Sequence, residues 1–307
     1  MILPNFLIIG SAKAGTTSLH YYLNQHPEIY MTAVKEPRFF ALEGKNLNFS
    51  GPDKDIINST SVTTYEEYIA LFEEVSSEKA IGETSPLYLY SEKAIQRIHH
   101  YLPDVKLIVI LRNPIDRAFS CYTHLLREGY ESLSFADSLK AEEGRIHDNW
   151  AHLWHYTNAG FYCEQLEPYL DTFGKENLKV YLYDQLASDP MGLLKDIFSY
   201  LEVDKSFEPD LSQKNISGLP KNRMLHTALN RKSGLRSAFK AVVPKSLRKG
   251  LSKELQNWNL KDKPRITSED RHFLENLYRE DVLKLQELIE EDLSAWLTPA
   301  SVITTSQ

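Results

Sequence analysis

The feature that most restricts how this chain can fold is a turn with two glycines that directly follows an apolar segment. Residues 6–9 are all apolar, as in a buried strand, and residues 10–17 continue with GSAKAGTT. Gly10 and Gly15 permit a tight turn in which backbone N–H groups converge, and the pattern of residues 17–24 predicts a helix after it. Converging N–H groups at a helix N-terminus bind anions, so the segment predicts a phosphate cradle between a strand and a helix.

The rest of the chain alternates between apolar runs and helical patterns. Further buried strands are predicted at residues 79–82, 106–111 and 178–183. Asn113-Pro114 and Asp189-Pro190 each combine a capping side chain with a proline suited to the first helical position, and an amphipathic helix is predicted over residues 267–289. The alternation predicts an α/β protein with a P-loop-like three-layer fold, a central parallel sheet flanked by helices.

Composition bears on partners and location. The net charge of −7 argues against a nucleic-acid binder, although residues 211–253 hold eleven Lys and Arg and no Asp or Glu. Such a run is typical of either a solvated face or a surface that binds an anion. Cys121 and Cys163 fit neither a disulfide framework nor a zinc site, so buried free thiols are expected. Without a secretory leader or an apolar stretch of about 20 residues, we expect a cytoplasmic protein with no membrane span.

The glycine turn differs from the P-loop of nucleoside-triphosphate-binding proteins. That motif continues with Lys and then Ser or Thr after its second glycine, whereas this chain continues with Thr16 and Thr17 and carries Lys13 inside the turn. The apolar run of residues 107–111 ends in Arg112, where a metal-dependent enzyme would place an aspartate for Mg²⁺. Both differences disfavour a Mg²⁺-dependent nucleotide kinase, and Arg112 suits a second phosphate contact at a strand end.

Together these segments resemble the sulfotransferases that use 3′-phosphoadenosine-5′-phosphosulfate (PAPS), in particular the bacterial and heparan-type (carbohydrate-type) members. Their 5′-phosphosulfate-binding loop resembles IIGSAKAGTTSL at residues 8–19, and their 3′-phosphate-binding segment resembles LIVILRNPIDRAFSCYTH at residues 107–124. Further similarity lies in KEPRFF at 35–40, GETSPLYL at 82–89, and the Gly160-Phe161-Tyr162 segment followed by VYLYDQLASDP. The resemblance covers most of the chain from Phe6 to about Asp210.

The resemblance also implies which residues hold the donor and its product, adenosine 3′,5′-bisphosphate, with no metal required. The residues matching the family's contacts to the 5′ end are Ser11, Lys13, Ala14, Gly15, Thr16 and Thr17. Arg112 and Ser120 match its contacts to the 3′-phosphate. Lys221 and Arg223 lie in a loose match to a C-terminal glycine- and lysine-rich loop, and are also assigned to the donor. Arg117 is expected to be a surface residue.

Sulfuryl transfer is an in-line reaction that needs a base on the acceptor and positive charge near the leaving oxygen. Lys13 is expected to stabilise that oxygen. The glutamate of the KEPRFF segment is the base in heparan-type relatives, which makes Glu36 the leading candidate. The phenylalanines beside it would raise its pKa through desolvation, while Lys35 and Arg38 would lower it.

Four other residues could also act as the base. Glu83 is the second candidate because it ends a predicted strand at the ligand-binding edge of the sheet. His20, His26 and His124 are expected to be packed or capping side chains instead.

We therefore expect a single sulfotransferase domain over residues 1–307 that acts on a hydroxyl or amine. The acceptor could be a glycan, a small hydroxylated metabolite or an acyl chain tethered to a carrier protein. Residues 231–263 are expected to form a helical insertion on the acceptor side, and the basic residues 231–253 fit either an anionic glycan or an acidic carrier. A catalytically silent protein that binds adenosine bisphosphate, and a nucleotide kinase, are the alternatives.

Overall fold

The computed structural model describes residues 2–212, 219–220, 260–261 and 264–297. The strands are β1 (Phe6–Gly10), β2 (Ile29–Met31), β3 (Ala80–Thr84), β4 (Lys106–Leu111), β5 (Leu178–Leu182), β6 (Leu219–Pro220) and β7 (Leu260–Lys261). The helices are α1 (Thr16–Leu23), α2 (Phe39–Leu42), α3 (Lys54–Thr60), α4 (Tyr65–Ala70), α5 (Leu87–Tyr90), α6 (Glu92–Tyr101), α7 (Pro114–Glu128), α8 (Phe135–Lys140), α9 (Glu142–His147), α10 (Tyr162–Phe173), α11 (Tyr183–Ser188), α12 (Pro190–Tyr200) and α16 (Ser268–Ile289). Short 3₁₀ helices η1, η2 and η3 occupy His152–Trp154, Asn158–Gly160 and Ser294–Leu297.

Five strands form one parallel sheet in the order β2-β3-β1-β4-β5. The four predicted strands are confirmed, with boundaries that differ by at most two residues. Strand β2 was not predicted because three residues at the sheet edge carry too short a pattern to recognise. The path from β3 to β4 passes over β1, so the chain switches sides beside β1, where open α/β sheets bind ligands.

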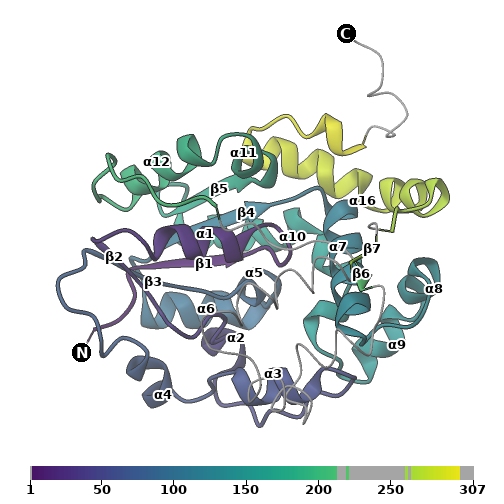
Figure 1. Cartoon of the computed structure of the whole chain (residues 1–307), viewed down its shortest axis with the longest axis horizontal. Helices are drawn as coiled ribbons and strands as arrows, with labels where there is room; N and C mark the ends of the chain where they lie inside the picture. Colours follow the sequence, from purple (N-terminus) through teal and green to yellow (C-terminus); the bar gives the residue numbers. More distant parts are fainter. Residues whose placement is uncertain (1, 213–218, 221–259, 262–263, 298–307) are drawn as a thin grey trace, which may run out of the picture.

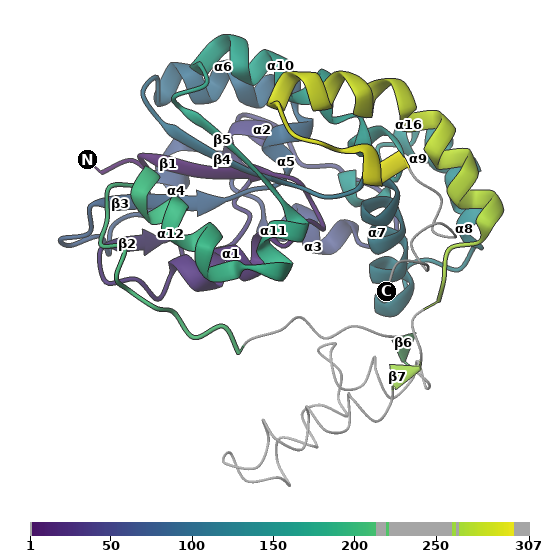
Figure 2. The same cartoon turned by 90° about the horizontal axis from the view of Figure 1, so that it is seen from above.

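Helices cover both faces of this sheet, as Figure 2 shows: α6, α10 and α16 lie on one side, and α1 and α12 on the other. Alternate residues of β1 point into the two cores. Leu7 and Ile9 join the core beneath α6, α10 and α16, and Phe6 and Ile8 join the core beneath α1 and α12. The predicted three-layer fold with a central parallel sheet is therefore confirmed.

The predicted helix starts are confirmed by their caps. The Asn113 side chain accepts a hydrogen bond from Ile115 N (3.0 Å), and that of Asp189 accepts one from Gly192 N (2.9 Å). Thr267 caps α16 by accepting from Asp270 N (3.0 Å). These caps supply partners for N–H groups that the first turn of a helix cannot satisfy.

Several predictions concern the C-terminal third of the chain. Lys221 and Arg223 lie outside the described residues, as does most of 231–263. Of that range only Leu260 and Lys261 are described, and they form strand β7, which pairs antiparallel with β6 rather than being helical. The single-domain extent stays a prediction. Both cysteines are buried free thiols, as expected, and no helix among the described residues is long and apolar enough to cross a membrane.

Candidate active site

The carboxyl ends of β1, β3 and β4 meet at one edge of the sheet, and the turn after β1 lies there. Ser11 N–H donates to the carbonyl of Ile110 on β4 (2.8 Å), which ties the turn to the neighbouring strand. Gly15 has φ of +93°, and a Cβ there would lie 2.8 Å from Leu186 Cδ2, so the position demands glycine. It precedes α1 without a side-chain cap, which leaves the first N–H groups of α1 available to an anion.

The side chains of Arg112, Tyr162 and Ser11 connect the two segments predicted to bind phosphate. Arg112 Nη1 donates to the carbonyl of Lys13 (3.2 Å), and the guanidinium stacks 4.7 Å from the ring of Tyr183. The hydroxyl of Tyr162 donates to the Arg112 carbonyl (3.0 Å) and lies 3.4 Å from Ser11 Oγ. The turn and the end of β4 therefore form one continuous surface, as expected for two contacts to the same nucleotide.

The predicted donor-binding residues differ in exposure. Ser11, Ala14 and Thr16 are buried, whereas Thr17 is exposed at the start of α1. Ser120 is partly exposed in the second turn of α7. Backbone N–H groups are thus the part of the turn most able to contact a phosphate, and the contacts themselves stay predictions.

Lys13 occupies the middle of the turn with φ of +70°. Burial lowers the pKa of its ammonium, with Arg127 and Lys35 adding to the effect, while Cys121 and Glu36 partly oppose it. A partly buried cation with other cations nearby is stabilised when an anion binds beside it. Lys13 is therefore suited to a ligand that brings negative charge.

Glu36 is clamped between two cations. Its carboxylate accepts from Lys35 Nζ (2.5 Å) and from Arg38 Nη2 (2.7 Å), with 27% of its side chain exposed. Burial alone would raise the pKa of Glu36, but the two cations together hold it at about 2. Both expected effects are present, and the ion pairs outweigh the desolvation. Phe39 and Phe40 belong to the core.

Glu83 has the opposite environment. Its side chain is completely buried at the end of β3, where Ser85 Oγ donates to it (2.9 Å) and Tyr68 OH lies at 3.5 Å. Burial raises the pKa of Glu83 to about 7, and the negative charge of Glu36 adds to the rise. The two candidate bases are thus close enough for the charge of one to affect the pKa of the other. Glu36 is ionised and partly exposed, whereas Glu83 is enclosed.

Three histidines surround these groups, and one of them was overlooked in the sequence. His20 Nδ1 lies 3.0 Å from Thr84 Oγ1, and His124 and His152 line a neighbouring cavity. Burial, with the nearby cations, lowers the pKa of His20 to about 4 and those of His124 and His152 to about 3, so all three are neutral at physiological pH. His26 is a buried structural residue, as predicted, with its ring 2.8 Å from the carbonyl of Asp204.

Arg117 is not on the surface, which corrects the expectation from sequence. It is buried on the inner face of α7, where Nη2 donates to the carbonyl of Tyr156 and Nη1 lies 3.6 Å from Cys121 Sγ. A buried guanidinium with a backbone partner is a structural group that ties α7 to the segment before α10.

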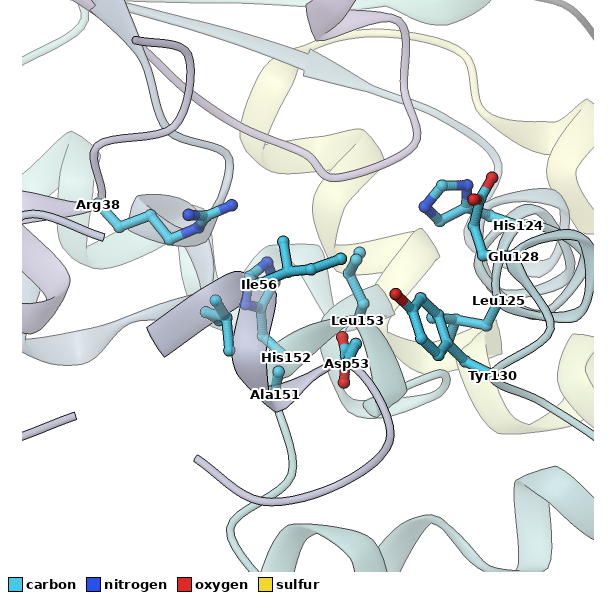
Figure 3. Close-up of a pocket in the computed structure, with 11 residues that line it drawn as sticks. Arg38, Asp53, Ile56, His124, Leu125, Glu128, Tyr130, Ala151, His152 and Leu153 are labelled. Carbon is cyan, nitrogen blue, oxygen red and sulfur yellow. The ribbon is translucent and has the colours of Figure 1, made fainter. Parts of the chain in front are cut away.

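A cavity of about 210 Å³ opens beside Glu36, between α3, α7 and η1. Figure 3 shows Arg38 on one side of this cavity and His124 with Glu128 on the other. Lys13 contributes to the lowered pKa of His124, and Glu36 contributes to the pKa values of both cavity histidines. Lys13 and Glu36 are therefore close enough to act electrostatically on the cavity, and Arg38 connects Glu36 to its wall.

Fold and site together define an α/β protein with a P-loop-like turn beside the centre of its sheet. The sequence profile described as "Sulfotransferase family" matches residues 4–209, and the chain belongs to this family. A crystal structure of a sulfotransferase from Alicyclobacillus acidocaldarius has a TM-score of 0.78 and 34% identity, covering 97% of this chain and 100% of that one.

Curated relatives match over shorter stretches. The membrane-associated sulfotransferase kil1 of Dictyostelium discoideum is 35% identical over 125 residues, 40% of this chain and 23% of its own. Mouse heparan sulfate glucosamine 3-O-sulfotransferase 3B1 is 29% identical over 208 residues, 65% of this chain and 46% of its own. The chain thus spans less than half the length of these relatives.

Proposed function

We propose that this protein transfers a sulfuryl group from PAPS to a hydroxyl acceptor. The observation that carries the proposal is the hydrogen bond between Arg112 and the Lys13 carbonyl, which holds two phosphate-binding segments at the same edge of the sheet. Family membership supplies the reaction class. A nucleotide with phosphate at both its 5′ and 3′ positions is the ligand that such a pair of segments fits.

The residues divide naturally between the two ends of the donor. The N–H groups of the turn and the N-terminus of α1 would hold the 5′-phosphosulfate, while Arg112 and Ser120 would hold the 3′-phosphate. In the reaction the bond between sulfur and the bridging oxygen breaks as the acceptor oxygen bonds to sulfur, releasing adenosine 3′,5′-bisphosphate. Lys13 would stabilise the charge that develops on the bridging oxygen.

Glu36 is the better candidate for the base that takes the acceptor proton. It is ionised and partly exposed, and it is paired with Arg38, a wall residue of the cavity. Glu83 has the higher pKa but is fully enclosed and hydrogen-bonded by Ser85, so an acceptor has no path to it. A carboxylate with a pKa near 2 is a weak base. Substrate binding would have to loosen its ion pairs, with the donor drawing away Lys35 or Arg38.

Replacement of Glu36 tests the assignment. Glu36→Gln should lower kcat about 10²- to 10⁴-fold with sulfur-labelled PAPS, because it removes the proton acceptor. Calorimetry should show unchanged affinity for adenosine 3′,5′-bisphosphate, since Glu36 is not assigned to the donor. Glu83→Gln serves as the matched control and should retain activity. A Glu36→Gln protein with full activity would move the base elsewhere, to Glu83 if that variant is inactive.

The same protein preparation distinguishes the other functions. Tight binding of adenosine 3′,5′-bisphosphate without transfer to any acceptor in a cell extract would identify a catalytically silent binding protein. ATP turnover that depends on Mg²⁺, together with no affinity for the bisphosphate, would identify a nucleotide kinase instead.

A further inference from the structure

The cavity beside Glu36 has walls that restrict what can enter it. Its volume of about 210 Å³ is below the roughly 300–1,000 Å³ of pockets that hold drug-sized ligands. Ile57 and Leu125 are buried in its walls, and Leu153 adds a further partly buried apolar side chain. Only a small group, or one end of a larger one, fits into such a space.

The charged side chains that line the cavity already have partners. Among the described residues that line it, Arg38 is the only Lys or Arg, and its Nη2 is already paired with Glu36 at 2.7 Å. Asp53 and Glu128 are carboxylates, and both lining histidines are neutral because burial lowers their pKa to about 3. Glu128 is itself paired with Arg127 (3.2 Å), and Asp53 accepts from Trp154 Nε1 (2.8 Å). A sulfated or carboxylated group would therefore find no unpaired cation among the described residues that line this space.

One wall residue is apolar yet unpacked. Ile56 projects from α3 with 53% of its surface exposed, among the largest values for any apolar residue in the described part of the chain. Figure 3 shows its side chain extended across the cavity, between Arg38 and Leu153. Covering this isoleucine with an apolar surface removes it from water and so lowers the free energy.

Two buried polar atoms in the same walls have no hydrogen-bond partner within the part of the chain that the structure describes. These are Arg38 Nε, which can only donate, and His152 Nδ1, which can donate or accept depending on the tautomer. A buried polar group without a partner destabilises the protein, and a polar atom of a ligand can offset this cost after a small side-chain adjustment. A single hydroxyl group is the simplest group that can both accept from Arg38 and bond to the ring of His152.

We infer that this cavity binds the acceptor, and that the acceptor is an uncharged small molecule with a hydroxyl on an apolar body. The inference rests on the proposed function and deepens it by naming a substrate class. The hydroxyl would lie between Arg38 and His152, beside Glu36, and the apolar body would cover Ile56 and Leu153. A sulfated glycan is the competing class, since heparan sulfate is the substrate named in several relatives, and the walls of this cavity do not suit it.

A direct comparison of two acceptors tests the substrate class. Wild-type protein is supplied with sulfur-labelled PAPS and either 2-naphthol or a desulfated or sulfated heparan oligosaccharide. We expect label on 2-naphthol, with kcat/KM at least about tenfold above that for either oligosaccharide. Labelling of an oligosaccharide alone, or of none of these acceptors, overturns the inference.

A charged substitution at the unpacked isoleucine tests the location. Ile56→Lys should raise KM for 2-naphthol at least about tenfold, because it removes apolar contact from the wall. Leu283→Lys is the matched control, because Leu283 is 48% exposed on α16, a helix that lies far from α3 in Figure 1. This variant should leave KM unchanged. An unchanged KM in Ile56→Lys overturns the cavity assignment.

Calorimetry with adenosine 3′,5′-bisphosphate separates this inference from the proposed function. Both variants should bind it as the wild type does. If the wild type does not bind it, the proposed function fails. If the wild type binds the bisphosphate but 2-naphthol is not the preferred acceptor, or Ile56→Lys leaves KM unchanged, only the inference about the cavity fails.

Discussion

At the scale of single residues, two carboxylates less than fifty positions apart have opposite ionisation properties. Lys35 and Arg38 hold the pKa of Glu36 at about 2 despite its burial. Burial raises the pKa of Glu83 to about 7, and hydrogen bonds from the hydroxyls of Ser85 and Tyr68 oppose this rise only in part. The difference in pKa comes from the neighbouring groups, since both residues are glutamates. It can be tested by measuring the free energy of unfolding as a function of pH.

The stability of the protein should fall with rising pH because of Glu83. Between pH 4.5, its ordinary pKa, and about 7, the folded protein holds a proton on Glu83 that the unfolded chain has released. Its contribution is therefore complete below pH 4.5 and is lost as pH rises through 7, a change of roughly 3 kcal/mol. Glu83→Gln should remove this part of the pH dependence in urea unfolding measured from pH 4 to 8. The exposed Glu67→Gln should behave as the wild type. If stability depended on pH in Glu83→Gln as it does in the wild type, the raised pKa of Glu83 would be contradicted.

At the scale of elements, the connection from β1 to α1 decides whether the phosphate site exists. Gly15 has positive φ and its Cα packs against Leu186 of α11, so backbone and packing both exclude a side chain. The turn is consequently held between the sheet and a helix that is distant in sequence. The N–H groups at the start of α1 have no side-chain cap, so we expect them to be available to a phosphate.

Gly15→Ala should damage both folding and donor binding. The added Cβ adopts a strained φ and meets Leu186 Cδ2 at 2.8 Å, so the unfolding free energy should fall by about 1–3 kcal/mol. Affinity for adenosine 3′,5′-bisphosphate should fall as well, measured by calorimetry below the unfolding temperature. Gly44→Ala is the control, since Gly44 also has positive φ (+67°) but has no atom within 4 Å of the added Cβ. Equal effects in the two variants would mean that φ strain, not packing against α11, dominates.

At the scale of the whole molecule, the C-terminal helix completes a core built by the first half of the chain. Asp281 of α16 accepts from the N–H groups of Tyr162 (2.9 Å) and Cys163 (3.1 Å), which are the first residues of α10. The N-terminus of α10 is thus capped by a residue more than a hundred positions later. Tyr162 in turn contacts Ser11 and Arg112, so α16 supports the phosphate site indirectly.

Removal of this distant cap should destabilise the entire protein. Asp281→Ala leaves two buried N–H groups without partners, and we expect a loss of roughly 2–4 kcal/mol in one cooperative unfolding transition. Glu280→Ala, on the exposed side of the same helix, should change stability by less than about 0.5 kcal/mol. Denaturant unfolding followed by circular dichroism measures both. A separate early transition in Asp281→Ala would indicate that α16 is not part of the same cooperative unit.

Much of the architecture could be predicted because it depends on local pattern. The strands β1, β3, β4 and β5 are apolar runs, and the caps Asn113, Asp189 and Thr267 act within three residues of their own positions. The edge strand β2 was missed because it is held by pairing with β3 rather than by a pattern of its own. The same limit applies to Arg117, whose backbone partner Tyr156 lies on another segment.

The sequence by itself determined the alternation of strands and helices, the glycine turn and the position of Arg112 at a strand end. These follow from side-chain volume, polarity and backbone freedom over a few consecutive residues. Only the tertiary structure decided that Glu36 is clamped by two cations, that Glu83 is enclosed, and that His152 joins His124 around a cavity. Ionisation and cavity shape depend on groups brought together from distant segments, since Coulomb energy and desolvation follow distance in space rather than separation along the chain.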